Sequence, residues 1–246
     1  MSIFDASYIL KFIPKLLQAL PVTIEITIVA AIGGLILGFL IAIVKIKKIK
    51  ILNQICGVYV SFMRGTPLLV QLFLSYYGLP VLLQALNEEM GTNLDVNQIP
   101  AIAFVFLAFS LNEAAYNSET IRSAILAVDK NEIEAGIAMG MTGLQVMRRI
   151  TLPQALVVAL PNLGNSFISL LKNTSLAFTV SVLDIMGAAK VASGRNLRFF
   201  EVYIAAALIY WIVCIIIEVL TKQLEKKIDV KRKNIKKGGL GSVRAE

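Results

Sequence analysis

Long apolar runs limit this chain more than any other feature. A membrane-spanning helix needs about 20 mostly apolar residues, and residues 22–44 form such a run with Glu25 as its one charged member. Further runs cover residues 55–83, 99–116, 155–189 and 202–220. The run at 155–189 is too long for one crossing, so we expect a full helix there followed by a shorter re-entrant or interfacial piece. The pattern predicts an all-α, polytopic membrane protein with about five transmembrane helices.

The composition excludes several other classes of protein. Hydrophobic residues make up 57% of the 246 residues and charged residues only 16%, against about 45–50% and about 25% in soluble domains. This excess excludes a disordered, collagen-like or disulfide-scaffold chain. The sequence contains no histidine, which removes every mechanism that needs an imidazole. Cys56 and Cys214 lie far apart in apolar stretches, so we predict two buried thiols and no metal site.

Positive charge predicts the orientation, because Lys and Arg near the ends of spans concentrate on the cytoplasmic side. Segments 45–54, 119–153 and 221–246 carry most of the 24 Lys and Arg residues, whereas segment 84–98 carries none. We therefore expect a plasma-membrane protein with its N-terminus outside the cell and its C-terminus in the cytoplasm.

The two ends of the chain lie outside the apolar runs. Lys11 and Lys15 are spaced four apart among apolar residues, so residues 1–17 are predicted to form an amphipathic helix on the membrane surface. The basic tail at residues 223–246 has no aromatic residue that could stack on a base. We predict that the tail anchors the topology by attracting anionic lipid and does not bind nucleic acid.

The segment between the third and fourth runs, residues 119–153, is longer than a simple connector needs. Within it, residues 131–141 combine apolar positions with small residues that allow another backbone to approach closely. Apolar residues exposed on a cytoplasmic surface are typical of a docking site for another protein. A loop packed on its own chain is the alternative interpretation.

A motif in this segment resembles the EAA loop of ATP-binding-cassette (ABC) importer permeases. Glu134, Ala135 and Gly136 are followed by Gly140 and, ten residues later, by Ile150-Thr151-Leu152-Pro153. The family usually has Ala where Gly136 stands, which is a small-for-small change. The resemblance implies a coupling helix at about 131–141 that docks in a groove of an ATPase. The predicted coupling residues are Glu134, Ala135, Gly136, Ala138 and Gly140.

Three further stretches resemble the polar amino acid branch of that family (histidine, glutamate, glutamine, arginine or opine type). They lie at residues 64–71, 115–122 and 153–176. The resemblance covers residues 18–222, with the EAA loop at about 128–153, and implies the type I (MetI-like) ABC importer permease fold. It also implies the partners: a second permease subunit, most simply a second copy, two cytoplasmic ATPase subunits and an extracytoplasmic amino-acid-binding protein.

The chain carries no phosphate-binding GxxxxGK[ST] loop. We therefore expect that the chain is not itself an enzyme. It needs no cofactor of its own, because the partner ATPase binds ATP and magnesium.

Polar residues inside the apolar runs are candidates for the substrate pathway, since such groups are costly in lipid. Asn112, Tyr116 and Glu119 share one helix face by their spacing. A zwitterionic amino acid needs an acceptor for its ammonium, for which Glu113 or Glu119 is suited, and a donor for its carboxylate. Either Arg64 or Lys172 is suited as that donor. The full predicted pathway set is Arg64, Thr66, Gln71, Asn112, Glu113, Tyr116, Glu119, Lys172 and Ser175.

Structural roles remain open for several of these residues. Glu119 and Arg122 are three apart and suited to pair with each other. Arg64 would also serve as a cytoplasmic orientation charge, Lys172 as a snorkelling or capping residue, and Asn112 as a bond between helices.

Two other functions also remain open at this stage. One is an ion-coupled secondary transporter or channel that works without an ATPase, and the other is a membrane anchor without transport. The lack of histidine and the few acidic residues in the runs argue against the first. The sequence does not name the amino acid.

Overall fold

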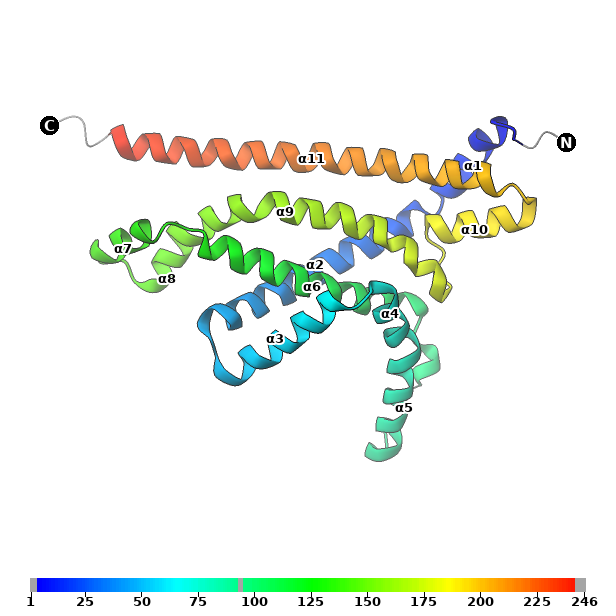
Figure 1. Cartoon of the computed structure of the whole chain (residues 1–246), viewed down its shortest axis with the longest axis horizontal. Coiled ribbons are helices and arrows are strands. Elements are labelled where there is room, and N and C mark those ends of the chain that lie inside the picture. Colours follow the sequence, from blue (N-terminus) through cyan, green and yellow to red (C-terminus); the bar gives the residue numbers. More distant parts are fainter. Residues whose placement is uncertain (1–3, 93–94, 242–246) are drawn as a thin grey trace.

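The computed structural model describes residues 4–92 and 95–241, and within these ranges it contains helices and no β-strand (Figure 1). The α-helices are α1 (Ser7–Leu17), α2 (Leu20–Lys47), α3 (Lys50–Gly65), α4 (Leu68–Phe73), α5 (Leu79–Met90), α6 (Ala101–Leu126), α7 (Lys130–Ala138), α8 (Gly143–Val146), α9 (Leu152–Asn173), α10 (Ile185–Asn196) and α11 (Phe199–Gly241). Short 3-10 turns lie at Val96–Gln98 (η2) and Thr174–Val180 (η4), and π-helical turns at Leu74–Gly78 (η1) and Met147–Thr151 (η3).

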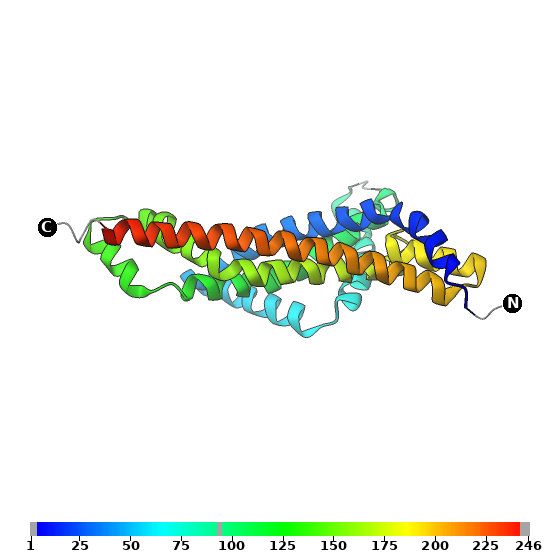
Figure 2. The same ribbon diagram turned by 90° about the horizontal axis from the view of Figure 1, so that it is seen from above.

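The long helices run along one axis of an elongated bundle (Figures 1 and 2). Helices α1 and α10 lie at one end of this axis, and α7 and α8 lie at the other end, where α11 also finishes. The first and last described residues are therefore at opposite ends of the bundle.

Four helical segments are long and apolar enough to cross a bilayer: Leu20–Lys47, Leu68–Met90, Gly143–Val180 and Phe199–Ile228. Helix α6 is a fifth candidate by length, because its 26 residues extend about 39 Å at the rise of an α-helix. It is more polar than the other four, and twelve of its residues are buried inside the molecule. The chain is thus a multi-pass membrane protein with four to five apolar helices.

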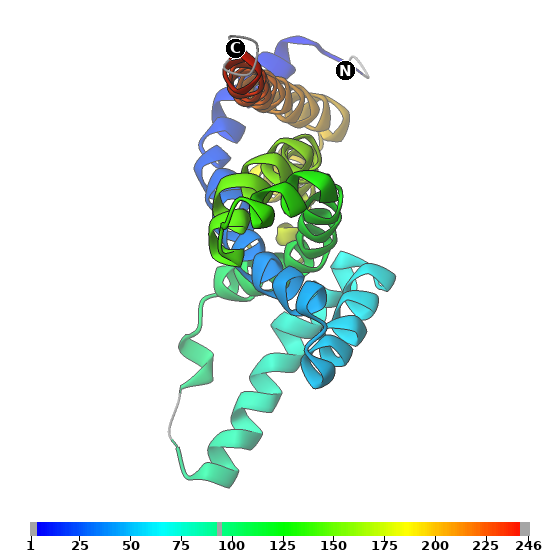
Figure 3. The ribbon, with the colours of Figure 1, turned by 90° about the vertical axis from the view of Figure 1, so that its left-hand side faces the viewer.

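The second apolar run is not one helix, which corrects the expectation of a single crossing over 55–83. Helix α3 ends at Gly65, Thr66 adopts an extended backbone conformation (φ −118°, ψ 149°) and α4 begins at Leu68. Pro67 explains the break, because a proline disfavours helical geometry in the residue before it. Helices α4 and α5 then continue as an arm that projects from the bundle (Figure 3).

Glycines bring α2 and α6 into close contact. A Cβ atom on Gly34 would lie 2.5 Å from Cβ of Glu113, and one on Gly38 would lie 3.0 Å from the Ala114 carbonyl oxygen. Close backbone approach through small residues is a common way to pack membrane helices. This contact sets the position of α6 and of its polar side chains.

The fourth run divides as predicted. Helix α9 continues through Asn173 into the 3-10 turn η4, and the separate helix α10 follows. Asp184 caps α10, since its Oδ1 accepts a hydrogen bond of 2.8 Å from the Gly187 N–H. The Tyr210 hydroxyl of α11 donates to Oδ2 of the same carboxylate at 2.9 Å. Asp184 thereby connects α10 to the last span.

Helix α1 lies within the predicted amphipathic segment. Its buried side chains, Phe12 and Leu16, belong to a cluster with residues of α10 and α11, including Ile185 and Val202. At the start of the helix, hydrogen bonds from the side chain and backbone of Ser7 hold the pKa of Asp5 below its usual value. The placement of α1 on the membrane surface stays a prediction.

Both cysteines differ from the expectation of buried thiols. Cys56 in α3 and Cys214 in α11 are only half-buried, because each lies on a helix at the periphery of the bundle. The basic tail reaches beyond the residues whose side chains are described, so its contact with lipid is untested.

Candidate functional site

The coupling segment forms a short helix and a tight turn at one end of the molecule (Figures 1 and 3). Asp129 caps α7 by accepting a hydrogen bond of 2.9 Å from the Asn131 N–H. The helix ends at Ala138, three residues earlier than predicted, because Gly140 adopts a left-handed conformation with φ +83°. The Met141 N–H then returns to the Gly136 carbonyl oxygen at 3.1 Å. Beyond the turn, α8 starts with a capping box between Thr142 and Gln145.

The surface of this turn is apolar and uncovered. Met139 is 77% exposed and Leu144 is 79% exposed, and neighbouring apolar side chains exposed to this degree are typical of a contact surface for another molecule. Of the predicted coupling residues, Glu134, Ala135, Ala138 and Gly140 are exposed. Gly136 is not, since a Cβ there would lie 2.6 Å from Ile150 Cδ1. Gly136 therefore packs α7 onto its own chain and does not belong to the outer surface.

The second site is polar and lies at the break between α3 and α4, against the middle of α6. The Gln71 side chain donates from Nε2 to the Met63 carbonyl oxygen and to Thr66 Oγ1, both at 2.8 Å. Asn112 donates from Nδ2 to Gln71 Oε1 at 2.8 Å. Gln71 and Asn112 are only 5% and 7% exposed. Gln71 thus provides a hydrogen-bond donor for the Met63 carbonyl oxygen, which Pro67 cannot satisfy because proline has no backbone N–H. Through Asn112, the amide pair also joins the break to α6.

Arg64 extends this site toward the surface. Its guanidinium carbon lies 5.5 Å from the centre of the Tyr116 ring, a cation–π geometry. Both side chains are exposed at the edge of the buried amide pair. Arg64 lies beside the middle of α6, and its use as a cytoplasmic orientation charge stays a prediction. Five predicted residues therefore meet here: Arg64, Thr66, Gln71, Asn112 and Tyr116.

The other predicted pathway residues lie elsewhere. Glu119 forms ion pairs with Lys45 of α2 and, at 2.8 Å, with Arg122. The interpretation of Glu119 as a carboxylate paired with Arg122 is confirmed, and Lys45 is a second partner. Glu113 is buried against the Gly34 contact with α2. Lys172 and Ser175 lie at the end of α9, where Ser175 Oγ donates to the Lys172 carbonyl oxygen at 2.7 Å.

Sequence reasoning missed two polar links. Lys45 was counted only as a loop charge, although it pairs with Glu119 across 74 positions of sequence. The network of Asp184, Tyr210 and Thr23, in which Thr23 Oγ1 accepts from the Ile185 N–H at 3.2 Å, was also missed. The isolated acidic residue in an apolar run was the available signal for Asp184. Among the described residues, no cluster of Cys, Asp and Glu could hold a metal ion.

The chain matches the family model described as binding-protein-dependent transport system inner membrane component over residues 34–230. It is 42% identical over 226 residues to the probable amino-acid ABC transporter permease protein PatM of Vibrio harveyi, covering 92% of this chain and 97% of that protein. It is 40% identical over 225 residues to the L-cystine transport system permease protein TcyL of Bacillus subtilis, covering 92% of each.

Solved structures agree with these relatives. The chain resembles an amino acid ABC transporter crystallised with histidines, with a TM-score of 0.77 and 33% identity over 91% of this chain and 99% of that chain. Inward-facing MetNI, a methionine ABC transporter, matches with a TM-score of 0.68 over 87% of this chain and 96% of that chain. At 17% identity, the second likeness concerns the fold alone.

The multi-pass helical fold and the family match together define a membrane transport component. The chain belongs to the family of binding-protein-dependent transport system inner membrane components, and it is a permease subunit of an ABC importer. The fold class and the family expected from the motifs are confirmed. Its domain boundaries and the roles of its individual site residues stay predictions.

Proposed function

We propose that this permease carries a polar amino acid across the plasma membrane, driven by ATP hydrolysis in a partner subunit. Two copies of the chain assemble with two cytoplasmic ATPases and receive the substrate from an extracytoplasmic binding protein. The chain holds no cofactor, and ATP with magnesium is bound by the ATPase. The α7 end faces the cytoplasm, since Lys47, Lys48, Arg148 and Arg149 lie near it.

The observation that carries this proposal is the apolar turn after α7. The exposed side chains here are Ile137 in α7, Met139 directly after it and Leu144 at the start of α8, and all three lie at one end of the bundle. An amphipathic helix with such anchors is suited to a groove in another protein. Gln154 of α9 donates a hydrogen bond to Glu132 of α7, so movement of the turn is transmitted to a spanning helix.

The mechanism is a shift between two populations. ATP binding brings the ATPases together and moves the two α7 turns with them, which favours an outward-open arrangement of the spans. A ligand shifts such an equilibrium only by its differential affinity for the two states. The binding protein must therefore bind the outward-open state more tightly.

The site at the α3–α4 break supports an amino acid as substrate. A guanidinium is suited to a carboxylate, and amide oxygens are suited to an ammonium group. Arg64 is exposed at the edge of the buried Gln71 and Asn112 pair, so a substrate carboxylate reaches its guanidinium directly, whereas an ammonium group reaches the amides only when the pair opens. PatM, TcyL and the similar solved transporter carry amino acid or L-cystine in their names.

The test is a pair of substitutions at Gly140. Nothing lies within 4 Å of a Cβ atom at this position, so only the backbone conformation opposes a side chain. Valine is strained at φ +83° by about 1–3 kcal/mol, whereas asparagine tolerates the left-handed region. We expect Gly140→Val to lower ATP-dependent uptake of L-cystine and L-glutamine by the reconstituted transporter at least tenfold, and Gly140→Asn to retain most of it.

Gly143→Ala is the matched control, because Gly143 also has open space and its φ is not positive. Co-purification of the ATPase shows whether the loss lies at the docking step. Full uptake with Gly140→Val would contradict the coupling role of the turn. Uptake driven by an ion gradient in vesicles that hold the permease alone would replace the proposal with a secondary transporter.

A further inference from the structure

Helix α9 has a polar face that its own chain leaves uncovered. Between residues 162 and 173, the exposed side chains are Asn162, Asn165, Ser169 and Lys172. Their spacing of three, four and three residues places them on one side of the helix. The run of α9 is otherwise apolar enough to cross the bilayer. The polar face therefore lies within a candidate membrane span.

The exposed side of α2 has the opposite character. Its exposed residues between 26 and 44 are Ile28, Val29, Ile32, Leu35, Ile36, Leu37, Phe39 and Leu40. Every one of these side chains is apolar and suited to lipid, and the exposed charge of Glu25 lies near the start of the helix. Helices α2 and α9 both extend along the bundle axis (Figure 1). A different depth in the membrane therefore does not explain why their exposed faces differ in polarity.

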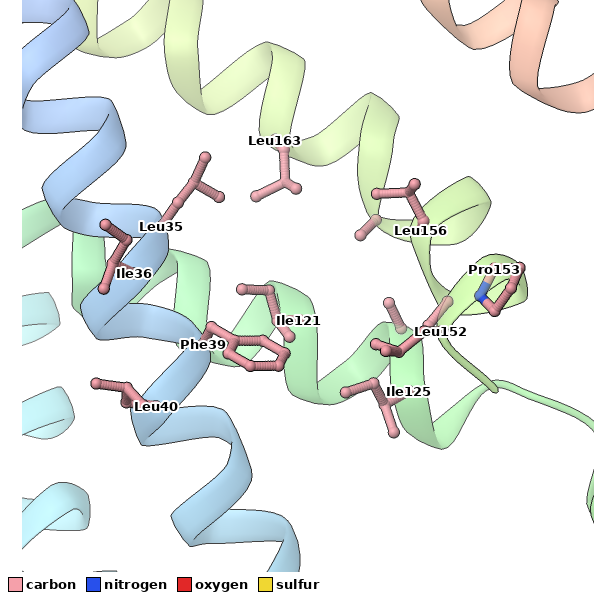
Figure 4. A pocket seen from close by; sticks show the side chains of 13 residues that line it. Leu35, Ile36, Phe39, Leu40, Ile121, Ile125, Leu152, Pro153, Leu156 and Leu163 are labelled. Carbon is pink, nitrogen blue, oxygen red and sulfur yellow. The ribbon is translucent and has the colours of Figure 1, made fainter. Parts of the chain in front are cut away.

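The other sides of α9 are occupied or apolar. Gly164 packs against α11, where a Cβ atom would meet Thr221 Cγ2 at 2.2 Å. Leu156 and Leu163 point into an apolar groove of about 700 Å³ shared with α2 and α6 (Figure 4). Lipid contact is thus available to α9 through this groove and not through its amides.

A partly polar recess adjoins the inner end of this face. It has a volume of about 380 Å³ and is lined by the polar residues Glu119, Thr120, Ser123 and Asn162 and by the apolar residues Ala124, Ala127 and Val158. The recess therefore continues the polar side of α9 onto α6. A charged or strongly polar group facing lipid at the centre of a span costs about 2.5–3.5 kcal/mol, so we expect the polar face of α9 to meet water, a polar ligand or polar groups of a partner subunit.

We infer that Asn162, Asn165, Ser169 and Lys172 form one wall of the water-filled passage through which the amino acid moves. This inference rests on the proposed function, in which a second permease supplies the opposite wall. The rise between successive members is about 4.5–6 Å, close enough for one small zwitterion to exchange hydrogen bonds between neighbours. Amides and hydroxyls both donate and accept, so the wall serves either end of the substrate.

Thiol accessibility in the assembled transporter tests the wall. Single Asn162→Cys, Asn165→Cys and Ser169→Cys variants are made in a chain that carries Cys56→Ser and Cys214→Ser. The membrane-impermeant reagent 2-(trimethylammonium)ethyl methanethiosulfonate is applied to the complex in proteoliposomes. The matched controls are Leu156→Cys in the apolar groove and Ile36→Cys on the exposed side of α2.

We expect the three wall thiols to react at least tenfold faster than the two control thiols. Reaction at the wall also blocks uptake, which a merely structural polar face would not explain. Wall thiols that react no faster than Leu156→Cys overturn the inference. The binding-protein-stimulated ATPase activity of each variant before labelling identifies those that are assembled, and only assembled variants are scored.

The outcomes separate this inference from the proposed function. Fast labelling together with ATP-independent uptake would retain the passage and reject ATP coupling. Slow labelling together with normal ATP-dependent uptake would reject the passage wall and retain the function.

Discussion

Helices α2 and α9 are both apolar spans, yet they are used differently. Helix α2 buries glycines against the α6 backbone and presents only apolar side chains outward between residues 26 and 44. Helix α9 buries Gly164 against one side chain of α11 and exposes amides and a lysine. Hydropathy therefore locates a span but does not show which of its faces contact lipid and which contact water. Helix α2 is a fixed support, and α9 borders the proposed passage.

The largest effect is expected where α2 meets backbone. Gly34→Ala places a Cβ atom 2.5 Å from Glu113 Cβ and 3.3 Å from the Ala114 nitrogen, so the two helices must separate. We expect a loss of about 1–3 kcal/mol in the free energy of unfolding, measured as a lower thermal midpoint of the detergent-solubilised complex.

Gly57→Ala in α3 is the control for this change. It has open space around its Cβ position, and alanine is favoured over glycine in a helix by about 1 kcal/mol. Equal shifts of the midpoint for Gly34→Ala and Gly57→Ala would show that the α2–α6 contact is not close.

A smaller effect is expected at the ion pair between α2 and α6. Lys45→Met leaves Glu119 with Arg122 alone, and the side chains of Lys45 and Glu119 are both less than one-fifth exposed. We expect a loss of about 1 kcal/mol, and a double-mutant cycle with Glu119→Gln measures the pair itself. If the losses in unfolding free energy of Lys45→Met and Glu119→Gln simply add in the double variant, the ion pair does not stabilise the contact between α2 and α6.

The smallest effect is expected where α9 meets α11. A Cβ atom on Gly164 meets only the end of the Thr221 side chain, which is able to rotate. We expect Gly164→Ala to cost less than about 1 kcal/mol, and Thr221→Ser to reverse this loss because serine lacks the Cγ2 methyl group. A midpoint as low as that of Gly34→Ala, without rescue by Thr221→Ser, would remove the distinction between the two helices.

Several elements were predictable because they depend on local sequence. The run at 22–44 specifies α2, and the motif from Glu134 to Pro153 indicates the coupling turn and the family. The break before Pro67 was readable from the proline but was missed, because the apolar run continues across it. The polar face of α9 was also readable as a spacing, but its exposure was not.

Continuous apolar runs and a spaced motif are properties of neighbouring residues, so the membrane environment, the class and the family of this chain follow from its local sequence. Which polar groups share a site depends on the packing of the folded chain. Gln71 meets Asn112 across 41 positions, and Lys45 meets Glu119 across 74. The physical reason is that an apolar helix buries almost any of its faces equally well in lipid. The rotation of such a helix is therefore set by contacts with other helices, such as those that Gly34 and Gly38 of α2 make with α6. No single segment of sequence contains both sides of such a contact.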